Sequence, residues 1–382
     1  MSPDRYNLAD LPLDRLRRRS SAKWASHPED VLPAFIAEMD FPLARPVKEA
    51  LIAAIELDDT GYAHPQGSGL AEAFTGFAGR RFGWEVDPAQ VTATTDVVGG
   101  LRALLDLVTS RGDGVIINPP VYHPFFSIIG EADRTLVEVP LAEDGTLDLE
   151  AITEAFRLGA RAMILCSPHN PAGTVPSSPQ LEELARIAVD HEAWILADEI
   201  HAPLTLPGAA HAPFLATSPA ARECGISFTS ASKAFNIAGL GCAVIVTAGR
   251  RSAGVVSSLP AGATHPGHLG VIGSRAAFEG GDDWLDQVID QLDRNRHLLS
   301  ELLAQYLPEA RYRPPEAGYL AWIDARDLGL DGDPATKLLQ EARVAVSGGP
   351  AFGAGGQGHF RLNIGTSPEL IEAAVRSIAE IT

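Results

Sequence analysis

The chain has 382 residues, of which 30 are lysine or arginine and 49 are aspartate or glutamate, so its formal net charge is −19. This excess of negative charge disfavours nucleic-acid binding and docking onto anionic membranes, because both need a basic surface. The sequence contains neither a recognisable signal peptide nor an apolar run of the roughly 18 residues that a membrane span requires. The three cysteines, Cys166, Cys224 and Cys242, are too widely spaced for a disulfide framework or a metal knuckle. We therefore expect a cytoplasmic protein without a metal site.

The first 45 residues are rich in proline and irregular, and we expect them to form an arm that packs on the rest of the chain. From about residue 90 to 247, short β-rich segments alternate with helical patterns such as residues 98–108, 149–158 and 180–191. This alternation is typical of βα units on a parallel sheet covered by helices on both faces. The expected strands are residues 91–95, 115–118, 135–139, 162–166, 194–197, 226–229 and 243–247.

The pattern changes after residue 267. Apolar residues recur at helical spacing over residues 283–306, a strand is expected over 319–324, and a last amphipathic helix over 368–381. The sequence therefore predicts the α/β class, with a mostly parallel sheet in a large domain and a small α+β domain at the C-terminus. The expected parts are the arm (1–45), the large domain (46–282) and the small domain (283–382).

Two short motifs match functional signatures without the context that those signatures need. Residues 353–358, GAGGQG, satisfy GxGxxG, but a dinucleotide-binding loop opens a helix, whereas a strand-like HFRLNI follows here. Residues 230–233, SASK, satisfy the SxxK motif of penicillin-binding proteins, but the SDN and KTG elements are absent from the sequence. We therefore interpret the first motif as a glycine loop, and the second does not predict a serine nucleophile.

Polar side chains follow four of the predicted strands, in residues 96–98, 167–171, 198–201 and 230–233. Because open α/β sheets bind ligands at the carboxyl ends of their strands, we expect these segments to form one site.

The residue types at these strand ends suit one cofactor. Lys233, directly after an apolar strand, is costly to bury as a charge and becomes reasonable if it forms a Schiff base. Asp198 supplies the carboxylate that a pyridinium nitrogen needs. The helix expected after Asp96 offers an anion site at its N-terminus, to which Ser230 could add a hydroxyl. Together these features predict pyridoxal 5′-phosphate.

The same residues resemble a known family. SPHNPAGTV (167–175), ADEIH (197–201) and SASKAFNIAGL (230–240) are similar to the signature of fold-type I, class I/II pyridoxal-phosphate enzymes. Further strings resemble the MalY/PatB type, a group of cystathionine β-lyase-like C–S lyases, and the resemblance extends from about residue 30 to the end. These strings are AEMDFP (37–42), TGY (60–62), PPVYHPF (119–125), DEIH (198–201), KAFN (233–236) and FRLNIG (360–365).

The resemblance implies roles for four catalytic and cofactor-binding residues. Lys233 would form the Schiff base and later move the Cα proton, and Asp198 would keep the ring nitrogen protonated. Asn170 would bond the phenolic oxygen of the ring, and Tyr122 would stack on its face. The structural alternatives are a surface lysine, a helix-capping aspartate, a turn-forming asparagine and a core tyrosine.

The resemblance also implies a homodimer. Tyr62 would reach the phosphate in the neighbouring subunit, Arg361 would bind the substrate α-carboxylate, and His201 would lie near the ring. A structural histidine and a solvated arginine are the alternatives. The expected cofactor contacts are completed by Val97, Val98, Ser230 and Ser232.

Two positions depart from the wider superfamily. Many of its aminotransferases have a phosphate-binding arginine eight residues after the lysine, where this sequence has Gly241. MalY/PatB-type enzymes also tend to lack that arginine. Asp96 would repel a phosphate, so we expect its side chain to cap the helix while the amides of Val97 and Val98 face the anion.

The resemblance therefore implies a lyase that cleaves the C–S bond of cystathionine or another L-cysteine S-conjugate by α,β-elimination. An aminotransferase that uses the same Lys233 is the first alternative. A non-catalytic regulatory protein on the same fold is the second, and the intact Lys233, Asp198 and Asn170 argue against it.

Overall fold

A seven-stranded sheet forms the centre of the chain in the computed structural model, which describes residues 6–64, 67–330 and 332–382. Its strand order is β2-β8-β7-β6-β5-β3-β4, and all neighbours are parallel except that β8 runs antiparallel to both β2 and β7. The strands are β2 (Val91–Thr94), β3 (Gly114–Ile117), β4 (Thr135–Glu138), β5 (Ala160–Cys166), β6 (Trp194–Asp198), β7 (Gly225–Thr229) and β8 (Ala243–Val246). Each overlaps a predicted strand, and the α/β class is confirmed.

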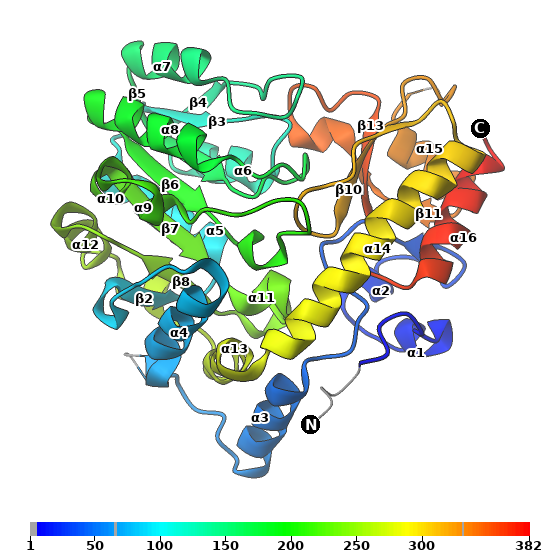
Figure 1. Cartoon of the computed structure of the whole chain (residues 1–382), viewed down its shortest axis with the longest axis horizontal. Helices are drawn as coiled ribbons and strands as arrows, with labels where there is room; N and C mark the ends of the chain where they lie inside the picture. The colour runs from blue at the N-terminus through cyan, green and yellow to red at the C-terminus, as the bar shows by residue number, and fades with distance from the viewer. Residues whose placement is uncertain (1–5, 65–66, 331) are drawn as a thin grey trace.

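Helices cover both faces of this sheet (Figure 1). Alternate residues of β5 enter different cores: Ala162 and Ile164 pack with α5 and α6, whereas Met163 and Leu165 belong to the core that contains α8. Because both faces are buried, the strands lack polar alternation and read as continuous apolar runs. The helices around the sheet are α4 (Leu70–Phe82), α5 (Val97–Val108), α6 (Pro124–Glu131), α7 (Leu149–Arg157), α8 (Ser178–Asp190), α9 (Phe214–Thr217), α10 (Pro219–Cys224), α12 (Arg250–Val256) and α13 (His268–Gly280).

The antiparallel direction of β8 differs from the simple βα pattern. The connection from β7 contains only the four-residue helix α11 (Ala231–Ala234) and a 3₁₀ turn at Ala238–Leu240. A helix that short rises only about 6 Å, so it cannot return the chain to the far end of the sheet. The chain instead re-enters the sheet from its carboxyl end, and the connection that contains Lys233 stays at that end.

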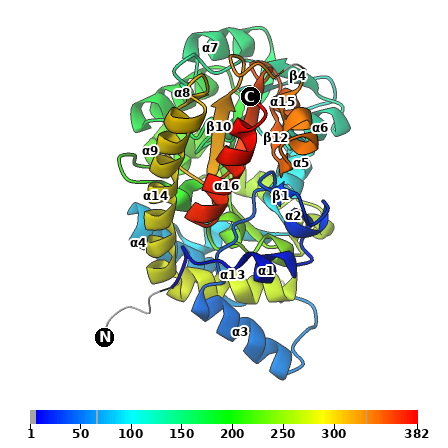
Figure 2. The same ribbon diagram turned by 90° about the vertical axis from the view of Figure 1, so that its right-hand side faces the viewer.

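A second, four-stranded antiparallel sheet has the order β12-β13-β10-β9. The long helix α14 (Asp282–Tyr306) leads into it, and α16 (Pro368–Ala379) packs beside α14 (Figures 1 and 2). The glycine loop 353–358 runs directly into β13 without opening a helix, which excludes the dinucleotide-loop interpretation. The elements are β9 (Arg311–Tyr312), β10 (Leu320–Asp324), α15 (Pro334–Gln340), β12 (Ser347–Gly348) and β13 (His359–Asn363).

The N-terminal segment is more ordered than the sequence predicts. It forms two short helices, α1 (Leu13–Arg17) and α2 (Ala22–Ala25), before β1 (Leu32–Pro33) pairs in parallel with β11 (Val344–Ala345). The helix α3 (Arg45–Glu56) follows and packs against α13 at the edge of the molecule (Figure 2). Short helices with few periodic apolar residues give weak sequence signals, so only their tertiary contacts define them. The first five residues of the expected arm lie outside the described residues.

Main-chain hydrogen bonds join the two sheet regions. The amide of Leu206 donates to the carbonyl of Glu316 (2.8 Å), and the amide of Gly318 donates to the carbonyl of Leu204 (2.9 Å). A third main-chain bond joins the two regions, because the amide of Val121 donates to the carbonyl of Phe352 (2.8 Å). These bonds hold the second sheet against the carboxyl ends of the central strands, where the predicted site residues gather.

We expect Leu196→Ala in β6 to lower the free energy of unfolding by about 2–5 kcal/mol, because this fully buried leucine would leave a cavity. Leu136→Ala in the edge strand β4 is the matched control, since Leu136 is 37% exposed. Urea denaturation of both variants measures the difference. Equal losses would contradict the assignment of Leu196 to the core.

Candidate active site

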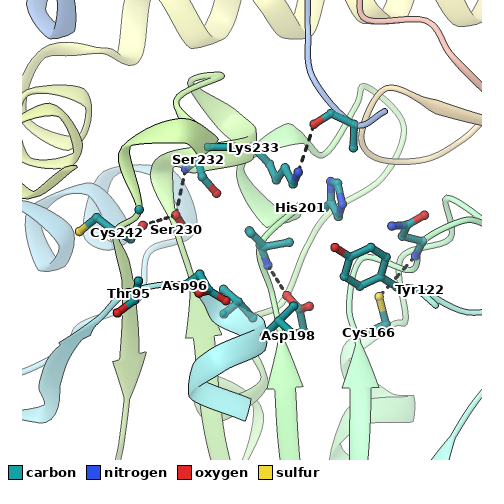
Figure 3. A pocket seen from close by; sticks show the side chains of 17 residues that line it. Thr95, Asp96, Tyr122, Cys166, Asp198, His201, Ser230, Ser232, Lys233 and Cys242 are labelled. Atoms are coloured by element: carbon teal, nitrogen blue, oxygen red, sulfur yellow. Dashed lines mark hydrogen bonds between the residues drawn. The ribbon is translucent and has the colours of Figure 1, made fainter. Parts of the chain in front are cut away.

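A pocket of about 770 Å³, including its open mouth, lies at the carboxyl ends of β2, β5, β6 and β7. Figure 3 shows Asp198 and Cys166 beside the ends of neighbouring strands, with Lys233 and His201 above them. All the predicted site residues line this pocket except Tyr62 and Arg361. Those that do are Val97, Val98, Tyr122, Asn170, Asp198, His201, Ser230, Ser232 and Lys233.

Lys233 lies in the short helix α11, which Ser230 begins. The Ser230 hydroxyl accepts from the amide of Ser232 (3.0 Å) and donates to the carbonyl of Cys242 (2.6 Å). The Lys233 amine donates to the carbonyl of Ala37 (3.1 Å; Figure 3). Burial and the positive charge of Arg361 lower the pKa of Lys233. A lowered pKa increases the fraction of neutral amine, which is the nucleophilic form.

Asp198 ends β6 and is almost fully buried. Burial raises the pKa of Asp198 to about 7, and the amide of Ile200 donates to its Oδ1 (3.1 Å). A buried carboxyl is stable as an anion only beside a cation. A protonated ring nitrogen would be such a cation, so this side chain fits the cofactor expected from the sequence.

The first turn of α5 lines one part of the pocket. Asp96 caps this helix as expected, because its Oδ1 accepts from the amide of Gly99 (2.8 Å). The amides at the start of such a helix, together with its dipole, favour an anion. Lys233 is the only lysine or arginine among the described residues that line the pocket. Gly241 also lines it with φ +63, a conformation that would strain an arginine there.

Arg361 lies on β13, outside the pocket lining but bonded to it. Its Nη1 donates to Oδ1 of Asn170 (2.9 Å), and its Nη2 donates to the carbonyl of Phe35 (3.0 Å) and to the hydroxyl of Ser347 (3.2 Å). Only its buried Nε has no partner among the described residues. Because Asn170 lines the pocket, the Arg361 guanidinium lies directly beside the pocket lining, and its Nε is a donor that a ligand could use.

Two aromatic side chains of the pocket are uncharged near neutral pH. Burial and the nearby charge of Asp198 raise the pKa of Tyr122. Burial, with the positive charges of Lys233 and Arg361, lowers the pKa of His201 to about 3. The His201 ring meets Tyr319 edge to face, with centroids 6.2 Å apart. Neutral rings beside the Lys233 amine add no further positive charge to this buried group.

Several pocket residues were missed by sequence reasoning. Cys166 and Cys242 both line the pocket, and burial raises the pKa of Cys242 to about 11, so its thiol stays protonated. Ala37 also lines it, through a carbonyl that no side-chain pattern could indicate. The AEMDFP string was the available signal for Ala37, and the adjacent polar segment 167–171 was the signal for Cys166, whereas Cys242 precedes β8 and had no such signal.

Tyr62 is separate from these residues. It is 99% exposed in the single chain and does not line the pocket.

In the part of the chain that the structure describes, no three histidine, cysteine or acidic side chains gather as a metal-binding group. No described helix is both long enough and apolar enough to cross a membrane.

The fold and this pocket define an α/β protein of the pyridoxal-phosphate enzyme type, and comparison with known proteins names the family. The family described as aminotransferase class I and II matches residues 37–378. The chain therefore belongs to this family.

Its relatives include proteins named as lyases. It is 35% identical over 371 residues to cystathionine beta-lyase of Corynebacterium glutamicum, covering 97% of this chain and 98% of that protein. It is 32% identical over 370 residues to cystathionine beta-lyase PatB of Bacillus subtilis, covering 94% and 95%. The structure of the PLP-bound C–S lyase of Staphylococcus hominis superposes with a TM-score of 0.90 at 27% identity, covering 98% of each chain.

The raised pKa of Asp198 predicts a pH-dependent stability of the cofactor-free chain. The ordinary pKa of this group is 3.8 and the folded value is about 7, so the folded chain binds more protons than the unfolded chain between these values. Its stability should therefore fall as the pH rises from about 4 to 7. Asp198→Asn removes this titration and should raise the melting temperature at pH 7.5 by roughly a few degrees, but not at pH 4. If the melting temperatures of the wild type and of Asp198→Asn changed in parallel with pH, the titration of Asp198 would not be the cause of the pH dependence.

Proposed function

We propose that this protein is a pyridoxal-phosphate-dependent lyase that cleaves the C–S bond of cystathionine or a related L-cysteine S-conjugate. The products are a thiol, pyruvate and ammonia, with one water consumed. The observation that carries the proposal is a buried pocket containing both a lysine of lowered pKa and a carboxyl that needs a cationic partner. Relatives named cystathionine beta-lyase at 32–35% identity over nearly the whole chain support this reaction.

The pocket residues fit the cofactor at three points. Lys233 offers an amine for its aldehyde, Asp198 offers an anion for its ring nitrogen, and the α5 N-terminus offers amides for its phosphate. The Ser230 hydroxyl is already bonded at both its hydrogen and its oxygen, so the amides of Val97 and Val98 are the better phosphate donors. When bound, the cofactor supplies the electron sink that accepts negative charge from Cα of the amino acid.

The protein residues then bind, orient and move protons. Arg361 binds the α-carboxylate, and the Asn170 bond keeps its guanidinium in place. Asp198 holds the proton on the ring nitrogen. The neutral amine of Lys233 removes the proton from Cα, and departure of the thiolate from Cβ follows. The second sheet restricts water around these groups, which strengthens their electrostatic interactions.

An aminotransferase is the second candidate, because the family includes transaminases and the same lysine would serve both reactions. In that reaction Lys233 would deliver the proton back to the cofactor carbon, and the Cβ substituent would be retained. The left-handed backbone at Gly241 would strain the arginine that many aminotransferases have at this position, and this favours the lyase.

We also propose a cytoplasmic homodimer whose interface includes α3. Exposed apolar residues continue from this helix into the following loop: Ile52 is 46% exposed, Ile55 54% and Leu57 78%. Contiguous exposed apolar side chains of this kind mark interaction surfaces. Tyr62 follows them and would reach the phosphate of the neighbouring subunit.

We further propose that the chain is divided into the arm (1–45), the cofactor domain (46–282) and the small domain (283–382).

The reaction is tested by incubating the purified protein with L-cystathionine and measuring pyruvate, thiol and keto acids. We expect pyruvate and free thiol in equal amounts, since elimination yields one of each. Lys233→Ala should abolish both products, and with them the absorbance band of the Schiff base between the lysine and the cofactor. A keto acid that retains the sulfur substituent would instead identify an aminotransferase.

The shared site is tested by heterodimers of Lys233→Ala and Tyr62→Ala chains carrying different affinity tags. Each homodimer should be nearly inactive. The heterodimer should regain about half of the wild-type activity, because one of its two sites has both native residues. If Tyr62 serves its own chain, the heterodimer will be as inactive as the two parents.

A further inference from the structure

Residues 37–40, here called the strap, connect the reacting lysine to distant parts of the chain. The carbonyl of Ala37 accepts from the Lys233 amine (3.1 Å) and from the Tyr319 hydroxyl (2.8 Å). Nδ2 of Asn363, at the end of β13, donates to the carbonyl of Glu38 (2.6 Å). The strap therefore lies between the lysine helix and the second sheet and bonds to both.

The side chain of Asn236, which follows the lysine helix, binds the main chain of the strap. Oδ1 of Asn236 accepts from the amide of Met39 (2.8 Å), and its Nδ2 donates to the carbonyl of the same residue (2.6 Å). Asn236 follows Lys233 by three residues and has φ +57, so its backbone turns sharply to bring the amide there. This two-point contact fixes the strap relative to the lysine.

The N-terminal region also binds the strap, through a buried ion pair between Lys23 of α2 and Asp40. Nζ of Lys23 donates to Oδ2 of Asp40 (2.8 Å) and to the carbonyl of Glu38 (3.2 Å), and both charged side chains are almost fully buried. Nε1 of Trp24 donates to Oδ1 of Asp40 (2.8 Å), and Nη2 of Arg19 donates to its carbonyl (2.8 Å).

This ion pair is a poor choice for stability alone. Removing two charges from water is costly, and apolar residues of similar size often stabilise a fold as well. The pair instead fixes the position of the strap, because both carboxylate oxygens of Asp40 and the ammonium of Lys23 form directional hydrogen bonds. A segment held in this way cannot shift without leaving a buried charge unpaired.

Building on the proposed function, we propose that Lys23, Asp40 and Asn236 are positioning residues for Lys233. They hold the Ala37 carbonyl where it binds the lysine amine whenever that amine is not attached to the cofactor. A tetrahedral amine that donates one hydrogen to this carbonyl directs its lone pair away from it. The amine thus stays oriented for attack on the aldehyde and for the later proton transfer at Cα.

The test measures how fast the cofactor-depleted full-length chain attaches pyridoxal 5′-phosphate, by visible absorbance. In this step the Lys233 amine adds to the aldehyde, a C=N bond forms and one water leaves. We expect Lys23→Met/Asp40→Asn and Asn236→Gly each to slow the limiting rate at saturating cofactor by about 10- to 100-fold. The cofactor concentration at half-saturation should stay unchanged, because the phosphate site is intact.

The variants are chosen so that folding does not obscure the result. The double variant leaves no buried unpaired charge, and glycine readily adopts the left-handed backbone of Asn236. Asp30→Asn is the control, since Asp30 pairs with Arg343 on the exposed side of the same N-terminal region, and its rate should equal that of the wild type. Circular dichroism and melting temperatures establish that each variant is folded.

The outcomes separate this inference from the proposed reaction. Wild-type limiting rates in both folded variants would overturn the positioning role, whatever substrate the enzyme uses. A change in half-saturation without a change in limiting rate would also overturn it, because it indicates a general loosening of the pocket. Slowed attachment with no thiol released from any S-conjugate would uphold the positioning role and disprove the lyase.

Discussion

Removal of water from the carboxyl end of the central sheet is the constraint on which the rest of this structure depends. The Lys233 amine and the Asp198 carboxyl both lie there, and burial shifts each pKa toward the neutral form. Such groups are unfavourable in a core unless a ligand completes them. The same desolvation therefore favours the neutral, nucleophilic amine of Lys233, and it leaves Asp198 with a carboxyl group that becomes a stable anion only beside a cation.

The fold places these groups together by controlling strand direction. Parallel strands β5, β6 and β7 end at one edge of the sheet, so Cys166 and Asp198 are paired neighbours in the register. The short connection to antiparallel β8 then keeps Lys233 at the same edge. The second sheet brings Arg361 over this edge, where it meets Asn170. The net charge of −19 gives no general attraction for an anion, whereas the first turn of α5, which lines the pocket, offers main-chain amides.

The N-terminal region has a larger part in the site than its irregular sequence indicates. Its helices hold the strap, and the strap holds the carbonyl that binds the reacting amine. This arrangement links a segment near residue 23 to chemistry at residue 233 through directional bonds. The active site is thus assembled from the arm, the central sheet and the second sheet, and each part limits the freedom of the others.

The sequence by itself determined the strands of the central sheet, the helix capped by Asp96 and the set of polar residues at the strand ends, because apolar period and capping chemistry are local properties. It also indicated Lys233 and Asp198, since a charge at the end of an apolar strand is anomalous. Only the tertiary structure decided the direction of β8, the position of Arg361 outside the pocket lining, and the contact of Ala37 with Lys233. These features depend on main-chain groups and on pairings between residues far apart in sequence, which no local pattern encodes.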